Sequence, residues 1–303
     1  CSPKDFETMM QLTYLTFTAP RRDDDAFASY KNRSKAELQN MDLNPSSSFS
    51  DSITSTLYSK HPRTLRIKAD MVDKMNYDKI LSMYQDRFKD ASDFTFILVG
   101  NVDVEAVKPL IESYLGSLPS INRKETFKDN HIAMRKGICK NEFIRQQETP
   151  KVNNFICYSG TCKYNLRNEI LMSMTDQLLN FIYTEKVRED EGGTYGVYPM
   201  GQLIKYPTEK AVLQIFFNTA PDKQEKLIKI IYDEAEAFAK NGPDEASLNK
   251  VKEYMLKKHS EDLKENGYWL NSIDEYLYTG IDPVKDYEQI INSITPKDVQ
   301  QFA

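Results

Sequence analysis

The spacing of apolar positions changes along the chain from helical to strand periodicity, and each change predicts an element. Apolar residues recur every three or four positions in 165–182 and again in 222–240, which is the spacing of one buried helix face. Runs at 94–99, 152–161 and 211–218 are rich in β-branched and aromatic residues and predict strands. The chain therefore combines many helices with a few strands.

The strand patterns are unevenly distributed, which indicates two domains. Helical patterns dominate residues 1–119, and the polar stretch 120–136 is interpreted as a linker. Residues 137–303 add strand patterns at 137–146 and from Thr194 onward. The prediction is an α+β fold of two repeated domains, each a mainly antiparallel sheet packed against helices.

The first of these domains is expected to be incomplete. Residues 94–99 form the single convincing strand pattern in 1–119, and a lone strand leaves its backbone donors and acceptors unpaired. The two domains also have similar sequence patterns at an offset of about 220 residues, for example in 27–31 and 248–252. The chain therefore resembles one and a half units of a tandem array.

Composition excludes several classes of partner. The 40 Lys and Arg are balanced by 45 Asp and Glu and mixed with them, for a net charge of −5, which gives no support to a nucleic-acid partner. No apolar run approaches the ~20 residues of a membrane span. The cysteines are too few for a disulfide scaffold: Cys1, Cys139, Cys157 and Cys162. The histidines are too far apart in the sequence for a zinc site, so no metal is expected in this chain: His61, His131 and His259. His259 is expected at the edge of the core with a local partner.

The stretch 187–199 predicts a junction from helix to turn to strand. The chain turns on Gly192 and Gly193, because glycine adopts the conformation that ends a helix at low steric cost. Arg188 and Tyr195 lie seven residues apart across this turn. A guanidinium offers forked donors to carbonyl groups and a phenol offers one donor to an oxyanion. On the residues alone, a simple helix cap with a core tyrosine and a peptide-gripping pair both remain open.

Four pieces of sequence, at 12–21, 93–101, 114–119 and 187–196, together resemble one family. The chain is similar to the C-terminal, non-zinc half of insulinase- or pitrilysin-type zinc metallopeptidases, in particular the bacterial four-domain branch. The resemblance implies a hydrolase of two similar halves, with the zinc motif His-x-x-Glu-His in the N-terminal half. This chain lacks that motif, so the resemblance implies that zinc belongs to the missing half and that the chain alone is inactive.

The resemblance also implies partners and residue roles. The partners would be the N-terminal catalytic half and peptide substrates, and such relatives are often exported to the periplasm. Arg188 and Tyr195 match the family's substrate-binding pair, with Gly192 and Gly193 shaping the turn. Tyr195 would have the catalytic role of donating to the tetrahedral intermediate, and Arg188 would hold a substrate carbonyl.

The strand after Gly193 could accept an extended peptide by strand addition. The alternatives to the half-enzyme are a non-catalytic scaffold subunit of the same fold and a stand-alone peptide-binding module.

Overall fold

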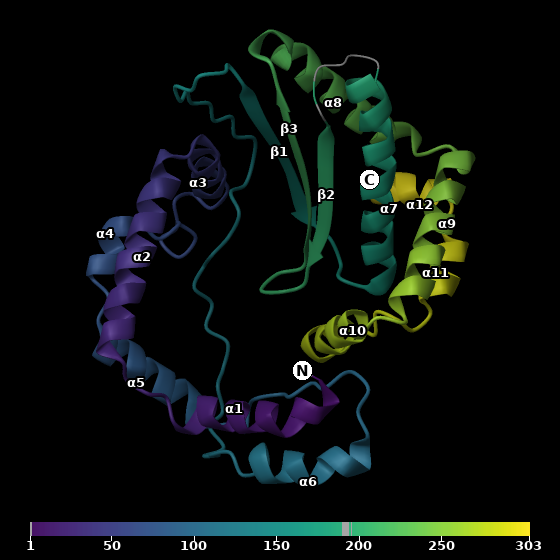
Figure 1. Ribbon diagram of the computed structural model, residues 1–303. Helices are drawn as coiled ribbons and strands as arrows, with labels where there is room; N and C mark the ends of the chain where they lie inside the picture. The colour runs from purple at the N-terminus through teal and green to yellow at the C-terminus, as the bar shows by residue number, and fades with distance from the viewer. Residues whose placement is uncertain (1, 190–193, 195) are drawn as a thin grey trace. The chain divides into compact units, whose positions relative to one another are not determined.

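The computed structural model describes residues 2–189, 194 and 196–303 of the chain. It divides into two compact units, Cys1–Arg145 and Gln146–Ala303 (Figure 1). The limits predicted from sequence, 1–119, 120–136 and 137–303, stay predictions. The structure groups residues 120–145 with the first unit.

The first unit is helical, and polar residues in the sequence mark where its helices begin. The side chain of Asp23 accepts a hydrogen bond from the backbone N–H of Ala26 at 2.9 Å, and Asp103 caps a later helix in the same way. Asn44 caps a helix that starts on a proline. The helices are α1 (Phe6–Thr18), α2 (Asp24–Leu43), α3 (Pro45–Leu57), α4 (Ala69–Asp73), α5 (Tyr77–Phe88) and α6 (Val104–Tyr114).

Aromatic rings and one group of charges hold this unit together. The ring of Phe17 on α1 meets Phe88 on α5 and Phe94 edge to face, each at 4.9 Å between centroids. A separate group of alternating charges links the end of α2 and the middle of α3 to the segment that follows them: Asp42, Asp51, Arg66 and Lys68.

Two predicted strands are not formed: 94–99, predicted for the first domain, and 137–146, predicted for the second domain but placed at the end of the first unit by the structure. Residues 94–99 and 137–146 have no strand pairing in the structure. A strand exists only when a neighbour takes up its backbone hydrogen bonds, and within the described residues neither segment has such a neighbour. The side chain of Asn141 donates instead to the hydroxyl groups of Ser52 and Thr56 on α3, at 2.8 and 2.9 Å.

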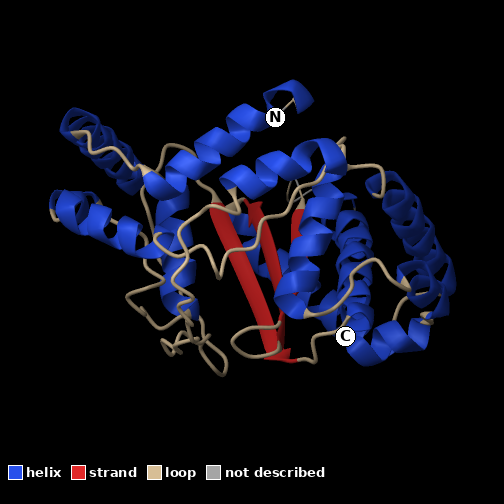
Figure 2. Cartoon of the chain, turned by 90° about the horizontal axis from the view of Figure 1, so that it is seen from below, coloured by secondary structure: helices blue, strands red, loops and turns tan. Residues whose placement is uncertain are grey.

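The second unit contains an antiparallel sheet of three strands with the order β1-β3-β2. The strands are β1 (Val152–Thr161), β2 (Val197–Ile204) and β3 (Lys210–Thr219). They coincide with the strand patterns predicted at 152–161, after Thr194 and at 211–218. Figure 2 shows the three strands side by side.

Helices pack on this sheet through one face. That face presents Ile215 and Phe217 of β3, both fully buried, to Leu227 and Ile231 of the second unit's core. Within the described ranges, no helix is both long and apolar enough to cross a membrane. The helices are α7 (Leu166–Tyr183), α8 (Gln224–Asn241), α9 (Glu245–Asp262), α10 (Asn266–Thr279), α11 (Tyr287–Ser293) and α12 (Pro296–Phe302).

The order of helices confirms the repeat seen in the sequence. Helices α2 to α5 recur as α9 to α12, each time as a long helix, a second long helix and two shorter ones. The starts of α2 and α9 are 245 − 24 = 221 residues apart, and those of α5 and α12 are 296 − 77 = 219 apart. The protein is therefore an α+β protein built on a repeated helical plan, with its sheet in the second unit.

Candidate functional site

The predicted site lies where α7 ends, and α7 is held firmly in the core. Asn165 caps the helix by accepting from the N–H of Asn168 at 2.9 Å. Apolar residues cover more than one face of the helix, so it is buried along most of its length. Its buried apolar residues are Ile170, Leu171, Met172, Met174, Leu178, Leu179 and Tyr183.

Beyond α7 the helix widens into a π-helical turn, η2 (Thr184–Glu189), which contains Arg188. Val187 in this turn and Tyr183 just before it are both 0% exposed. The hydroxyl of Tyr183 donates to the carbonyl of Ile231 on α8 at 3.3 Å, which ties the helix end to its neighbour. Insertions that create π-helical turns are frequent at functional sites. The backbone at Arg188 is therefore fixed by buried neighbours.

The glycines and the tyrosine of the predicted site, Gly192, Gly193 and Tyr195, lie outside the described residues. For Arg188 the backbone is described and the side chain is not. The pairing of Arg188 with Tyr195 stays a prediction.

The chain on the far side of the turn is also anchored. The hydroxyl of Thr194 accepts from the N–H of Gly196 at 3.2 Å and lies 3.1 Å from its carbonyl oxygen. Val197 then starts β2, is 2% exposed and pairs with Phe217 of β3. Both ends of the segment that carries Tyr195 are thus attached to the core.

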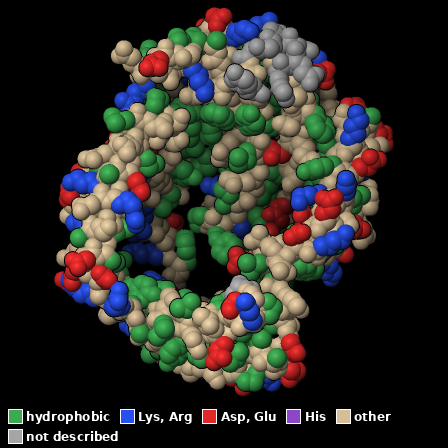
Figure 3. Space-filling model, in the orientation of Figure 1, with side chains coloured by type: hydrophobic (Ala, Val, Ile, Leu, Met, Phe, Trp, Pro, Cys, Tyr) green, Lys and Arg blue, Asp and Glu red, His purple; other side chains and the backbone are tan. Residues whose placement is uncertain are grey.

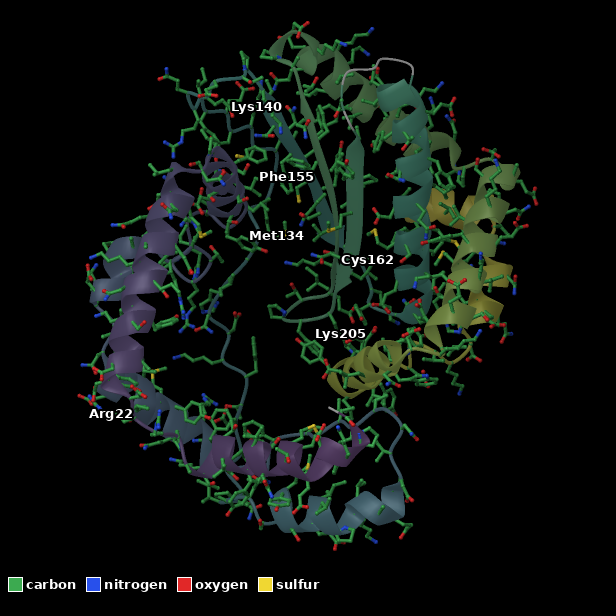
Figure 4. All side chains as sticks on the ribbon, in the orientation of Figure 1. Arg22, Met134, Lys140, Phe155, Cys162 and Lys205 are labelled. Carbon is green, nitrogen blue, oxygen red and sulfur yellow. The ribbon has the colours of Figure 1, made fainter. Side chains whose placement is uncertain are left out.

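An aromatic row crosses the other face of the sheet near the start of β2. Phe155 of β1 and Tyr198 of β2 both pair with Phe216 of β3, so the three rings form one row across all three strands. Tyr198 and its neighbour Met200 are 54% and 62% exposed. Figure 3 shows hydrophobic side chains gathered over the strands, and Figure 4 marks Phe155 on β1.

Gly196 makes room for this row. A Cβ at that position would lie 2.9 Å from the hydroxyl oxygen of Tyr198 and 3.0 Å from its Cζ. The bare backbone of Gly196 therefore allows the ring of Tyr198 to lie across it. The row was not predicted from the sequence, because it depends on the strand register.

A cluster of polar side chains lies near the start of α7. The hydroxyl of Tyr164 donates to Oε1 of Glu275 on α10 at 3.0 Å. Burial raises the pKa of the neighbouring Glu169 to about 7. Glu169 and Glu275 line a cavity of about 390 Å³ with residues of α9. Glu169 is in the first turn of α7, at the opposite end from Arg188, so this group is separate from the predicted site.

The histidines do not fit a zinc site. His259 is buried, as expected from the sequence, with its ring stacked on Tyr287 at 4.4 Å and its Nδ1 3.2 Å from the hydroxyl of Tyr268. Nδ1 of His61 accepts from a backbone N–H two residues further on. In the described part of the chain, no three His, Cys, Asp or Glu residues are placed to hold a metal ion.

Two curated proteins resemble the chain over most of its length. "Zinc protease PQQL-like" of Arabidopsis thaliana is 24% identical over 89% of this chain and 30% of its own length. "Probable zinc protease PqqL" of Escherichia coli is 22% identical over 97% of this chain and 32% of its own length. The chain thus spans about a third of the length of these relatives.

Solved structures share the fold. The crystal structure of the periplasmic protease PqqL from Escherichia coli superposes with a TM-score of 0.82 at 19% identity, over 99% of this chain and 33% of that one. The first half of the same protease gives 0.70 at 12% identity, over 98% of this chain and 67% of that one. The chain therefore superposes on a third of the full-length relative and also on two thirds of its first half, as expected for a repeated architecture.

A family model also matches the chain. The model described as "Peptidase M16 inactive domain" matches residues 74–255, which is more than half of the chain and includes α7, the predicted turn and the whole sheet. The chain belongs to the peptidase M16 family, as its inactive domain.

Proposed function

We propose that this chain is the substrate-binding half of a zinc-dependent peptidase and forms part of the wall of a chamber between two halves. The observation that carries this proposal is the π-helical turn at Arg188, in a chain that belongs to the inactive-domain family of M16 peptidases. Relatives named zinc proteases are about three times as long as this chain, which leaves room for a separate zinc-bearing half. That half would be the partner of this chain.

Arg188 and Tyr195 would hold the peptide. Arg188 would donate to a substrate carbonyl, and the phenol of Tyr195 would donate to the oxyanion of the tetrahedral intermediate. Buried Val187 before the turn and buried Val197 after it support this role, because donors that are held in place before the reaction stabilise an oxyanion best. Removing one such donor raises the barrier by roughly 3–4 kcal/mol.

The aromatic row would extend this grip along the substrate. Tyr198 follows Tyr195 by three residues, and its ring is exposed beside Phe216 and Phe155. Flat apolar rings bury apolar side chains of many shapes, which suits a surface that holds unfolded peptides.

We assign no zinc-dependent step to this chain, because in the described residues its histidines are not placed to bind zinc together. Bond cleavage would belong to the half that holds the metal, and this chain would bind and orient the peptide. The Escherichia coli relative is described as periplasmic, and we propose an exported location for this protein as well.

The test separates binding from turnover in the two-half protein. Tyr195→Phe keeps the ring and removes the donor, so kcat for a quenched peptide should fall at least a hundredfold with little change in KM. Arg188→Lys keeps the charge and loses the forked donor, so kcat/KM should fall. Tyr278→Phe, which alters a 65% exposed tyrosine on α10, is the matched control and should have no effect. Unchanged kcat in Tyr195→Phe would overturn the proposed role.

A further inference from the structure

The outer edge of β2 determines how a peptide can approach the turn. In the described sheet β2 has β3 on one side, and its other side forms an edge. The backbone groups of an antiparallel strand point alternately to its two sides. An added strand needs the outward-pointing groups at every second residue.

Two consecutive outward positions of β2 offer no donor. The N–H of Gly201 donates to Oδ1 of Asp176 on α7 at 2.9 Å, so it points away from β3 and is already bonded. Pro199, two residues earlier, points to the same side and has no N–H at all. A peptide that added to this edge would lose two successive hydrogen bonds in the middle of the strand.

Helix α7 approaches β2 closely at this point. A Cβ at Gly201 would lie 2.8 Å from Cγ of Met172, which itself is buried. The carboxyl group of Asp176 is half-buried between the two elements. Burial raises its pKa to about 6, although the hydrogen bond from Gly201 lowers it. With or without its proton, the carboxyl group keeps an oxygen that can accept from Gly201.

We propose that Asp176 is a positioning residue that fixes β2 against α7 and closes the outer edge of β2 to strand addition. Helix α7 leads into the turn at Arg188, and β2 starts two residues after Tyr195. The contact between Asp176 and Gly201 therefore sets the distance between the two ends of the turn. This consequence for catalysis rests on the function proposed above. It replaces the strand addition after Gly193 that the sequence suggests, since a peptide would meet side chains here and not a free strand edge.

The first test needs no activity. Hydrogen–deuterium exchange of the Gly201 amide in the two-half protein should be at least tenfold faster in Asp176→Ala than in the parent. Asp176→Asn keeps an acceptor oxygen and should stay within threefold of the parent. Ser173→Ala, an exposed change on the same helix, is the control. Equal exchange in parent and Asp176→Ala, or loss of protection in Asp176→Asn, would overturn the proposal. If Asp176→Ala does not fold, exchange in Asp176→Asn alone still tests the proposal, because loss of protection at Gly201 would contradict it.

The second test measures peptide hydrolysis by the same proteins. Asp176→Ala should lower kcat/KM about tenfold, because a small displacement of positioned groups is costly, and Asp176→Asn should stay within twofold. A simple loss of charge would affect both variants equally, and that result would overturn the positioning role. If Tyr195→Phe and Arg188→Lys leave hydrolysis unchanged, the proposed function fails instead, and the exchange experiment still decides whether Asp176 holds β2.

Discussion

The close approach of α7 to β2 predicts that Gly201→Ala destabilises the second unit. Gly201 does not have a left-handed backbone conformation, so on chain entropy alone the change should stabilise by about 0.4–1 kcal/mol. The new methyl group, however, would lie 2.8 Å from Cγ of buried Met172. Overpacking of this kind costs about 1–3 kcal/mol. The clash exceeds the entropy gain, and we expect a net loss of about 1–2 kcal/mol.

Urea unfolding followed by tryptophan fluorescence measures the stability of the second unit, which contains Gly201. Trp269 is the only tryptophan of the sequence and lies on α10 of the second unit, where its indole N–H donates to the carbonyl of Leu263 at 2.9 Å. Met172→Ala alone should cost about 2–5 kcal/mol, since it leaves a cavity.

A double-mutant cycle then isolates the clash. In Gly201→Ala/Met172→Ala the methyl group has space, so the double variant should be more stable than the sum of the single changes by at least about 1 kcal/mol. Additive energies, or stabilisation by Gly201→Ala alone, would refute the close packing of α7 on β2.

Single contacts elsewhere in the second unit also have measurable effects. The raised pKa of Glu169 means that the folded protein holds a proton that the unfolded chain releases, so the free energy of unfolding should fall as pH rises from 4.5 to about 7. Glu169→Gln should weaken this dependence in urea titrations, and the raised pKa of Asp176 should leave a smaller one below about pH 6. Tyr183→Phe removes the hydrogen bond to the carbonyl of Ile231 and should lower the free energy of unfolding by about 1 kcal/mol in the same assay; no change would show that the bond contributes nothing. Tyr198→Ala should raise KM for peptides with bulky apolar side chains more than for small polar ones, and an equal effect on both would exclude the aromatic row from the site.

Three of the strands predicted for the second domain are confirmed, whereas the strands predicted at 94–99 and 137–146 are wrong. The pattern at 152–161 coincides with β1 because its partner β3 lies in the same unit. The run at 94–99 has an even higher share of apolar residues, yet it pairs with no strand in the described residues. A local pattern shows that a segment can form a strand, whereas the strand itself depends on a distant neighbour.

The candidate site also combines features that the sequence predicts with features that it does not. The helix over 166–183 and the strand that starts at Val197 follow from the spacing of apolar residues, which is a local signal, whereas the turn predicted between them lies partly outside the described residues. The aromatic row and the bond from Gly201 to Asp176 depend on strand register and helix packing, which a single sequence does not reveal. An acidic residue such as Asp176 within a buried apolar helix was the one available signal, because a half-buried carboxyl group needs a partner.

The most direct test of the central claim is peptide hydrolysis by this chain alone and together with the zinc-bearing half, with zinc present and a quenched, unstructured peptide as substrate. We predict no hydrolysis by the chain alone, weak or no hydrolysis by the zinc-bearing half alone, and full activity from the two together that Tyr195→Phe lowers at least a hundredfold. If the zinc-bearing half cleaves equally well without this chain, the chain is not the substrate-binding half, and a scaffold role takes its place.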